Sequence, residues 1–356
     1  MEETIIFDNE NELIKWIVYD LNNQRLEISF SKYFAYYLVP AHEVTIRIIP
    51  PNSEISQVEI NFDFSMKNII KRLSNNADLV YFNALYSNIN IRNVKFNKSV
   101  NFNDFEFKTN ILFTNVHFCS YVDFSNSIFE KSVSFEYSQI DTLTNFSQSY
   151  FKDDVNFTNN KIKETIISNI RFYKSCNFRN NTIVSDITIY KLIDNVNASL
   201  TFNNMIFDNE NSLLSIINSN FEYIILLDTR IKGIINIEHS SVNIVNFKYS
   251  FLNGGVINIT NLIIKNFANR ESALFFKNQA YARNNIIDAL EYKAKEIEMH
   301  KKELLNKPNK TFKDSFDIIS IFFMHFNYTF HIFCNIIYSF KCFVFFIYFI
   351  FIIFIH

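Results

Sequence analysis

The fold is decided by residues 100–129, which read VNFNDFEFKTNILFTNVHFCSYVDFSNSIF. A phenylalanine recurs here every 11 residues, and the spacing continues on both sides. The first column of aromatic residues consists of Phe102, Phe113, Phe124, Phe135, Phe146 and Phe157. A second column, 5 residues behind, consists of Phe107, Phe118, Phe129, Ile140, Phe151 and Ile162. Self-similarity at a fixed period predicts a solenoid.

The spacing of apolar residues within each unit predicts short strands. They lie at positions i−2, i and i+5, whereas an amphipathic helix places them at i, i+3, i+4 and i+7. Because side chains alternate along a strand, residues i−2 and i share the inner face, and the Asn, Asp or Ser between them points to water. A coil of four such strands needs about 20–22 residues and stacks on the next at roughly 4.8 Å. Residues 79–267 therefore predict about eight or nine coils, in a rod on the order of 40 Å long with a phenylalanine core.

Several units match one short consensus, in which a small residue, Asp or Asn, and a central Leu or Phe precede two variable residues. They are Val100-Asn101-Phe102, Val122-Asp123-Phe124, Cys176-Asn177-Phe178, Ile235-Asn236-Ile237 and Val245-Asn246-Phe247. Over about half of its length the chain thus resembles the pentapeptide-repeat family. The resemblance implies a mainly β fold, a right-handed quadrilateral parallel β-helix. This chain departs from the family in its branched i−2 residues and its 11-residue step, and the family's functions vary widely.

Residues 1–75 do not repeat and are predicted to form a small α/β cap that covers the open edge of the first coil. Leu26–Phe34 and Glu43–Ile49 are predicted strands, and Ser65–Leu73 is a predicted short helix. The repeat region is placed at 76–267.

Residues 268–306 are predicted to form one long amphipathic linker helix, because the apolar period changes to steps of three and four. Its seam consists of Ala273, Phe276, Ala280, Arg283, Ile287, Leu290, Ala294, Ile297, Lys301 and Leu304. The seam would close the last coil or pair with a second copy of the chain, which makes a homo-oligomer the expected assembly in the second case. Arg270-Glu271, Ala289-Leu290-Glu291 and Lys302-Glu303-Leu304 also resemble the linker of bacterial membrane-anchored pentapeptide-repeat proteins.

Residues 332–355 are almost wholly apolar and long enough to span about 30 Å of hydrocarbon, which predicts a transmembrane helix in a lipid bilayer. Residues 312–330 are predicted to lie along the membrane interface. Basic residues gather before the span, and only His356 follows it. By the positive-inside rule we expect a single-pass protein of the inner, cytoplasmic membrane with its solenoid in the cytoplasm.

Composition excludes several functions. The formal net charge of −2 disfavours a nucleic-acid partner. Gly233, Gly254 and Gly255 are the only glycines, so neither phosphate-cradling loops nor nucleophile elbows can be assembled.

Titratable residues form no recognisable site in the sequence. Cys119 and Cys176 are interpreted as small buried residues of the repeat, and His117 is predicted to point outward. The adjacent Asp153 and Asp154 are interpreted as a solvated turn. The sequence leads us to assign no catalytic, cofactor-binding or metal-ligating residue and to expect no cofactor and no enzymatic activity.

The sequence favours a membrane-anchored, non-catalytic scaffold whose rigid solenoid binds a protein partner. The alternative is a component, or a truncated relative, of a pentapeptide-repeat channel or transport protein. An enzyme acting on an elongated polymer and a topoisomerase-directed mimic of DNA are weaker hypotheses, because neither the required acidic cluster nor a strong negative charge is present.

Overall fold

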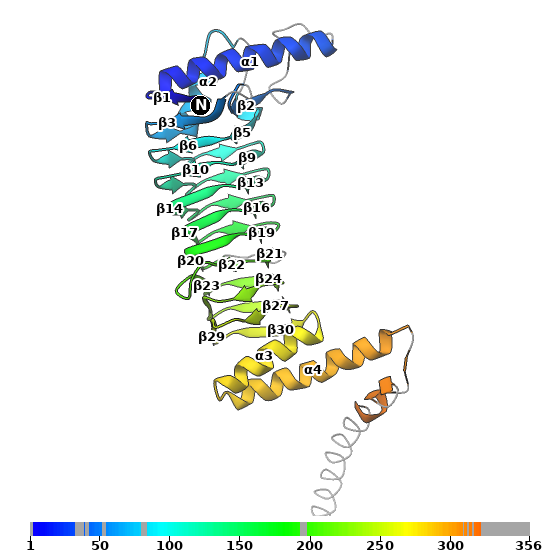
Figure 1. Cartoon of the computed structure of the whole chain (residues 1–356). Helices are drawn as coiled ribbons and strands as arrows, with labels where there is room; N and C mark the ends of the chain where they lie inside the picture. The colour runs from blue at the N-terminus through cyan, green and yellow to red at the C-terminus, as the bar shows by residue number, and fades with distance from the viewer. Residues whose placement is uncertain are drawn as a thin grey trace, which may run out of the picture. The chain divides into compact units, whose positions relative to one another are not determined.

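The computed structural model describes residues 3–32, 39, 43–51, 55–79, 84–192, 198–308, 310–311, 313–314 and 317–321. Its contacts divide the chain into two compact units, residues 1–275 and 276–356. The first unit is a parallel β-solenoid of about 8 turns, which confirms the predicted architecture. Figure 1 shows its strands stacked in order from β2 to β30, with α1 across the N-terminal end.

Four faces make up each coil, and all their strand pairs are parallel. Face one is a 10-stranded sheet of β2 (Thr45–Ile48), β5 (Asn88–Arg92), β9 (Ile111–Thr114), β13 (Val133–Glu136), β16 (Val155–Thr158), β19 (Cys176–Arg179), β21 (Ser199–Asn203), β24 (Asn220–Leu227), β27 (Ser241–Asn246) and β30 (Ile263–Phe267). Face two contains β1 (Glu3–Phe7), β3 (Ile55–Ile60), β6 (Val94–Phe96), β10 (His117–Phe118), β22 (Ile206–Phe207), β25 (Arg230–Ile231) and β28 (Phe251–Leu252).

Faces two and three join into one 16-stranded sheet, because three strands run through the corner between them: β14 (Gln139–Asn145), β17 (Lys161–Ser168) and β20 (Thr182–Tyr190). Face three otherwise contains β4 (Phe64–Ser65), β7 (Val100–Asn101), β11 (Val122–Asp123), β23 (Leu213–Ile217), β26 (Ile234–Glu238) and β29 (Val256–Thr260). Face four contains β8 (Glu106–Phe107), β12 (Ile128–Phe129), β15 (Tyr150–Phe151) and β18 (Arg171–Phe172).

The core is built from stacked aromatic columns, one per face. The register pairs Phe113 with Phe135 and Phe135 with Phe157, so one coil takes 22 residues here. The rings of Phe135 and Phe157 stack with centroids 4.8 Å apart and planes 2° apart. That separation equals the spacing of neighbouring strands, so parallel pairing itself places successive rings at stacking distance.

The 11-residue step arises because tight and wide corners alternate. At each tight corner the residue two positions after the buried phenylalanine or isoleucine has a positive φ, as at Asn93 (53°) and Asn115 (51°). Asparagine is one of the few side chains that tolerate this left-handed conformation, so the turns need no glycine. The amide of Asn115 also donates to Oδ1 of Asn93, 2.8 Å away, so corner residues bond from coil to coil.

Buried polar side chains line the inside of the tight corners. Ser138 Oγ accepts from the backbone N–H of Val116, and Asn160 Oδ1 accepts from that of Ser138, at 3.1 and 2.8 Å. Asn181 Oδ1 continues the series by accepting from the backbone N–H of Asn160 at 2.9 Å. Each side chain satisfies an amide that the corner of the preceding coil would otherwise leave unpaired in the core.

The N-terminal end is covered by α1 (Glu10–Lys32) and by β1 and α2 (Met66–Ser74). Ser65 caps α2, as expected for the predicted Ser65–Leu73 helix. The predicted strand Leu26–Phe34 is wrong, because α1 continues to Lys32. The side-chain amide of Gln24 explains why a helix belongs there. It donates to the backbone oxygen of Thr45 and accepts from its N–H, at 2.8 and 2.9 Å, and so pairs with the open edge of β2 as a strand would.

The predicted linker helix is wrong in one respect, because it is interrupted. The chain forms α3 (Arg270–Ala282) and α4 (Ile286–Asn306), separated at Asn284, whose φ is 57°. Asn285 caps α4 by accepting from the N–H of Asp288. After the break α4 buries Ala289, Tyr292 and Glu296, which lie outside the predicted seam, and leaves the seam residues Ile287 and Leu290 exposed. The seam residue Leu304 is buried as predicted. A homo-oligomer through this region stays a prediction.

Within the second unit, α4 and the end of α3 are joined by an ion pair and a ring contact. Lys277 Nζ lies 2.6 Å from Glu296 Oε2, and both side chains are largely buried. The rings of Phe276 and Tyr292 meet edge to face at 5.9 Å. In the part of the chain that the structure describes, no helix is both long and apolar enough to cross a bilayer. The predicted span, 332–355, lies outside the described residues, as does most of the predicted interfacial segment 312–330.

Candidate functional site

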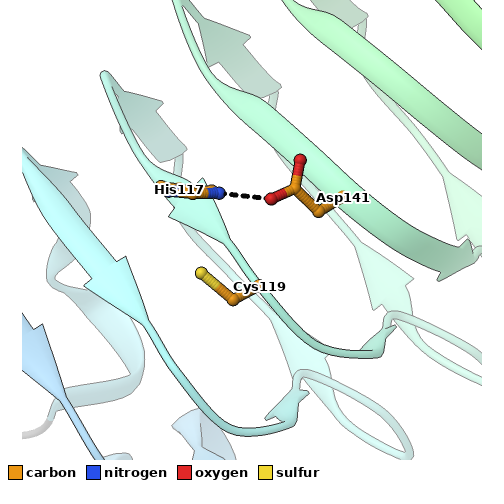
Figure 2. A group of neighbouring side chains, drawn as sticks. All are labelled: His117, Cys119 and Asp141. Carbon is orange, nitrogen blue, oxygen red and sulfur yellow. Dashed lines mark hydrogen bonds and ion pairs between the residues drawn. The ribbon is translucent and has the colours of Figure 1, made fainter.

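Face two presents a cluster of three side chains that carry nitrogen, sulfur and oxygen donors (Figure 2). His117 is in β10, Cys119 follows two residues later, and Asp141 is in β14 of the next coil. The potential ligand atoms of the three residues all lie within 4.8 Å of one another, and each residue is half-buried. His117 Nε2 lies 2.5 Å from Asp141 Oδ2.

The local fold dictates this convergence. Side chains two apart on an extended strand share a face, which brings Cys119 beside His117. The register pairs Phe118 with Ile140, so that Asp141 comes one coil after Cys119. Neighbouring strands lie about 4.8 Å apart, which allows the side chains of adjacent coils to touch.

Hydrogen bonds orient the Asp141 carboxylate. Partial burial alone would raise its pKa, but the hydrogen bonds from His117 and Gln139 outweigh burial and leave the pKa below its ordinary value. Gln139 Nε2 donates to Oδ1 at 2.7 Å, while Oδ2 faces His117. The carboxylate is therefore ionised at neutral pH and held by two neighbours.

Cys119 is poorly suited to nucleophilic chemistry. Burial is the largest effect and raises the pKa of its thiol; Lys95 lowers it, and the negative charges of Asp141 and Glu59 raise it by smaller amounts. Because the thiolate is the nucleophile, a raised pKa leaves the sulfur protonated and unreactive at neutral pH. The geometry itself offers nitrogen, sulfur and oxygen donor atoms within 4.8 Å of one another.

A second feature of the same sheet is a groove of about 520 Å³ near the C-terminal end of the solenoid, around β22, β25 and β28. Its lining includes apolar, aromatic and cationic side chains: Met205, Ile206, Phe207, Arg230, Lys232, Tyr249 and Phe251, together with Asn204, Asp228 and Asn253. Ile206, Tyr249 and Phe251 are exposed by 52%, 60% and 48%.

Two cations, Arg230 and Lys232, and one acidic residue, Asp228, line the groove. Arg230 lies over the ring of Phe251, 5.7 Å from its centroid. Among the described residues, neither Arg230 nor Lys232 forms an ion pair with an acidic side chain. The groove therefore combines exposed apolar surface with positive charge.

The residues weighed in the sequence have structural roles where the structure describes them. Asp153 pairs with Lys174 at 2.7 Å, and this hydrogen bond holds the pKa of Asp153 below its usual range. Asp154 accepts from the backbone N–H of Ser175 in the next coil. Cys176 is buried in the core, which raises its pKa. Cys119, by contrast, is half-exposed, so its interpretation as a buried residue is wrong.

Sequence reasoning placed His117 outward but missed its neighbours. The signal was present in the coil length, because a period of 22 residues sets Asp141 directly after Cys119 on one face. No match was found among protein-family models, curated proteins or solved structures, so the chain's own residues carry the functional argument.

Proposed function

We propose that the solenoid is a non-catalytic docking rod for a protein partner, held at a membrane by residues 332–355. The observation that carries the docking role is the groove around Arg230 and Phe251, in which exposed aliphatic and aromatic side chains lie beside two cations. The parallel solenoid supplies the rigid scaffold that presents this groove, while the role itself is argued from the groove, because a fold does not imply a function.

Charge complementarity indicates what the groove accepts. Arg230 and Lys232 attract carboxylates, while Ile206, Tyr249 and Phe251 offer apolar and aromatic contact. Aromatic and arginine side chains dominate the binding energy of many protein interfaces. We therefore assign the groove to an acidic protein segment that carries an aromatic or aliphatic anchor.

Charge reversal in the groove tests this assignment. A photo-crosslinking amino acid at Ile206, in cells that express the full chain, is expected to capture one discrete partner. The substitutions Arg230→Glu and Lys232→Glu together should reduce the adduct at least about tenfold, because a like charge replaces an attraction in a desolvated contact.

The matched control reverses Lys161 and Lys163, which lie on the same face three coils before Arg230 and are exposed. This control reversal should leave the amount of crosslinked adduct unchanged. If the two double charge reversals reduced the adduct equally, the adduct would depend on the overall charge of the rod. The docking role of the groove would then be wrong.

Membrane attachment makes a separate prediction. The full chain should sediment with membranes and resist extraction by alkaline carbonate, because about 20 apolar residues are enough to span the hydrocarbon core. Deleting residues 332–355 should release it to the supernatant. A deleted chain that still resisted extraction would show that another part of the molecule holds the membrane.

A further inference from the structure

The His117, Cys119 and Asp141 cluster has a composition that the docking role does not explain. Imidazole, thiolate and carboxylate are all ligands of divalent zinc, whereas magnesium and calcium avoid sulfur and nitrogen. Within the described residues, it is the one group of three or more such side chains whose ligand atoms come together.

Its dimensions suit a tetrahedral ion. Zinc binds nitrogen and oxygen at about 2.0–2.2 Å and sulfur at about 2.3 Å, so tetrahedral ligands lie roughly 3.3–3.8 Å apart. The three donors here all lie within 4.8 Å of one another, and His117 Nε2 and Asp141 Oδ2 are already closer than the tetrahedral spacing. Side-chain rotations on a rigid sheet suffice to close the site. In Figure 2 the ring of His117 reaches toward the carboxylate of Asp141 in the next coil, and the sulfur of Cys119 lies below His117.

A residue outside the cluster holds one of the three possible ligands in place by a hydrogen bond. Gln139 holds one carboxylate oxygen of Asp141, which leaves the other directed at His117. Such outer hydrogen bonds orient metal ligands and strengthen binding.

Two lysines flank the cluster on the same face. Lys161 stands one coil after Gln139, and Lys95 stands one coil before His117. Lys95 forms an ion pair with Glu59 at 3.5 Å, which offsets its charge.

A hydrogen-bonded surface pair of His117 and Asp141 would need no cysteine. The thiol stands on the same face by virtue of its position two residues after His117, and it supplies the donor that distinguishes a zinc site from a salt bridge.

We propose that His117, Cys119 and Asp141 bind one zinc ion on the outer surface of face two. Three protein ligands leave one coordination position, which water or a side chain of another molecule would fill.

Cobalt is the probe for the test, since it takes the same tetrahedral site and its bond to a thiolate absorbs light. The full chain is purified in detergent without a histidine tag, stripped with a chelator and titrated with Co²⁺. We expect a thiolate-to-cobalt absorption band that saturates at one ion per chain and disappears when Zn²⁺ is added.

The Cys119→Ser variant should lose the band. His117→Asn and Asp141→Asn should each weaken Zn²⁺ binding, measured by calorimetry, by at least about tenfold, as losses around metal sites do. All three side chains lie on the outer surface, so circular dichroism should show the solenoid intact in every variant.

Two controls separate Cys119 from the other thiols. Cys176→Ala removes the buried cysteine, and Cys334→Ser with Cys342→Ser removes the two in the apolar tail. Both variants should keep the band. A wild-type chain without the band, a band that survives Cys119→Ser, or zinc affinity indifferent to His117 and Asp141 would each overturn the site.

Discussion

Replacing Phe124 with alanine is expected to lower the free energy of unfolding by about 3–5 kcal/mol, because the change removes a fully buried ring and leaves a cavity. Phe124 is 0% exposed. Its ring stacks on Phe102 at 4.9 Å and on Phe146 at 4.8 Å, and it meets Phe135 edge to face at 5.6 Å. One substitution thus breaks a column on both sides and its contact with a second column.

Chemical denaturation of the full chain in detergent, followed by circular dichroism, measures this loss. Hydrogen exchange locates it, because coils contact mainly their neighbours and protection should fall first in the coils around Phe124. Phe124→Leu is the matched control and should cost less than about 1.5 kcal/mol, since it keeps most of the apolar volume. If Phe124→Ala and Phe124→Leu lower the free energy of unfolding by the same amount, the stacked rings do not stabilise the solenoid as described.

Gly233→Ala is expected to destabilise the solenoid by about 3 kcal/mol, for a steric reason. A Cβ at this position would lie 2.1 Å from the backbone oxygen of Ser212 and 2.6 Å from the ring of Phe207. The coil before Gly233 approaches too closely for any side chain, and a backbone oxygen cannot move aside without distorting its strand. Denaturation and hydrogen exchange of residues 206–238 measure the effect.

Gly254 is the matched control, because it is glycine for a different reason. Its φ is +83°, but no atom lies within 4 Å of a Cβ placed there. Gly254→Asn should therefore cost only about 1 kcal/mol, since asparagine tolerates positive φ, whereas Gly233→Asn should be at least as damaging as alanine. Equal costs at the two positions would contradict the close-approach argument.

The repeat region was predictable from the sequence because its signals are local and recur in every coil. Phe113, Phe135 and Phe157 follow a period that only stacked coils can bury, and the register confirms their pairing. The left-handed corners were visible only as polar residues. The repeat pattern assigns no role to Asn93 and Asn115, whereas their positive φ shows that they build the turns.

The ends of the solenoid were less predictable because distant partners determine them. Leu26 to Phe34 alternates as a strand does, yet Lys32 is still helical, because Gln24 pairs with the edge of β2 and the buried face of α1 includes Leu13, Ile17 and Leu21. In the C-terminal region no glycine or proline marks the break at Asn284. The seam therefore continued unbroken in the sequence, although α4 buries a different side.

The candidate zinc site also combines features that local sequence predicts with features that only distant partners determine. The sequence alone determined a solenoid with an aromatic core and outward residues at alternate positions, because these properties follow from periods of two, 11 and 22 residues. It also determined the apolar tail, which follows from composition and length. Tertiary structure decided which outward residues meet. His117, Cys119 and Asp141 come together because parallel register brings adjacent coils within about 4.8 Å of each other. A local pattern records which way a side chain points, but only the stacking of coils determines what stands beside it.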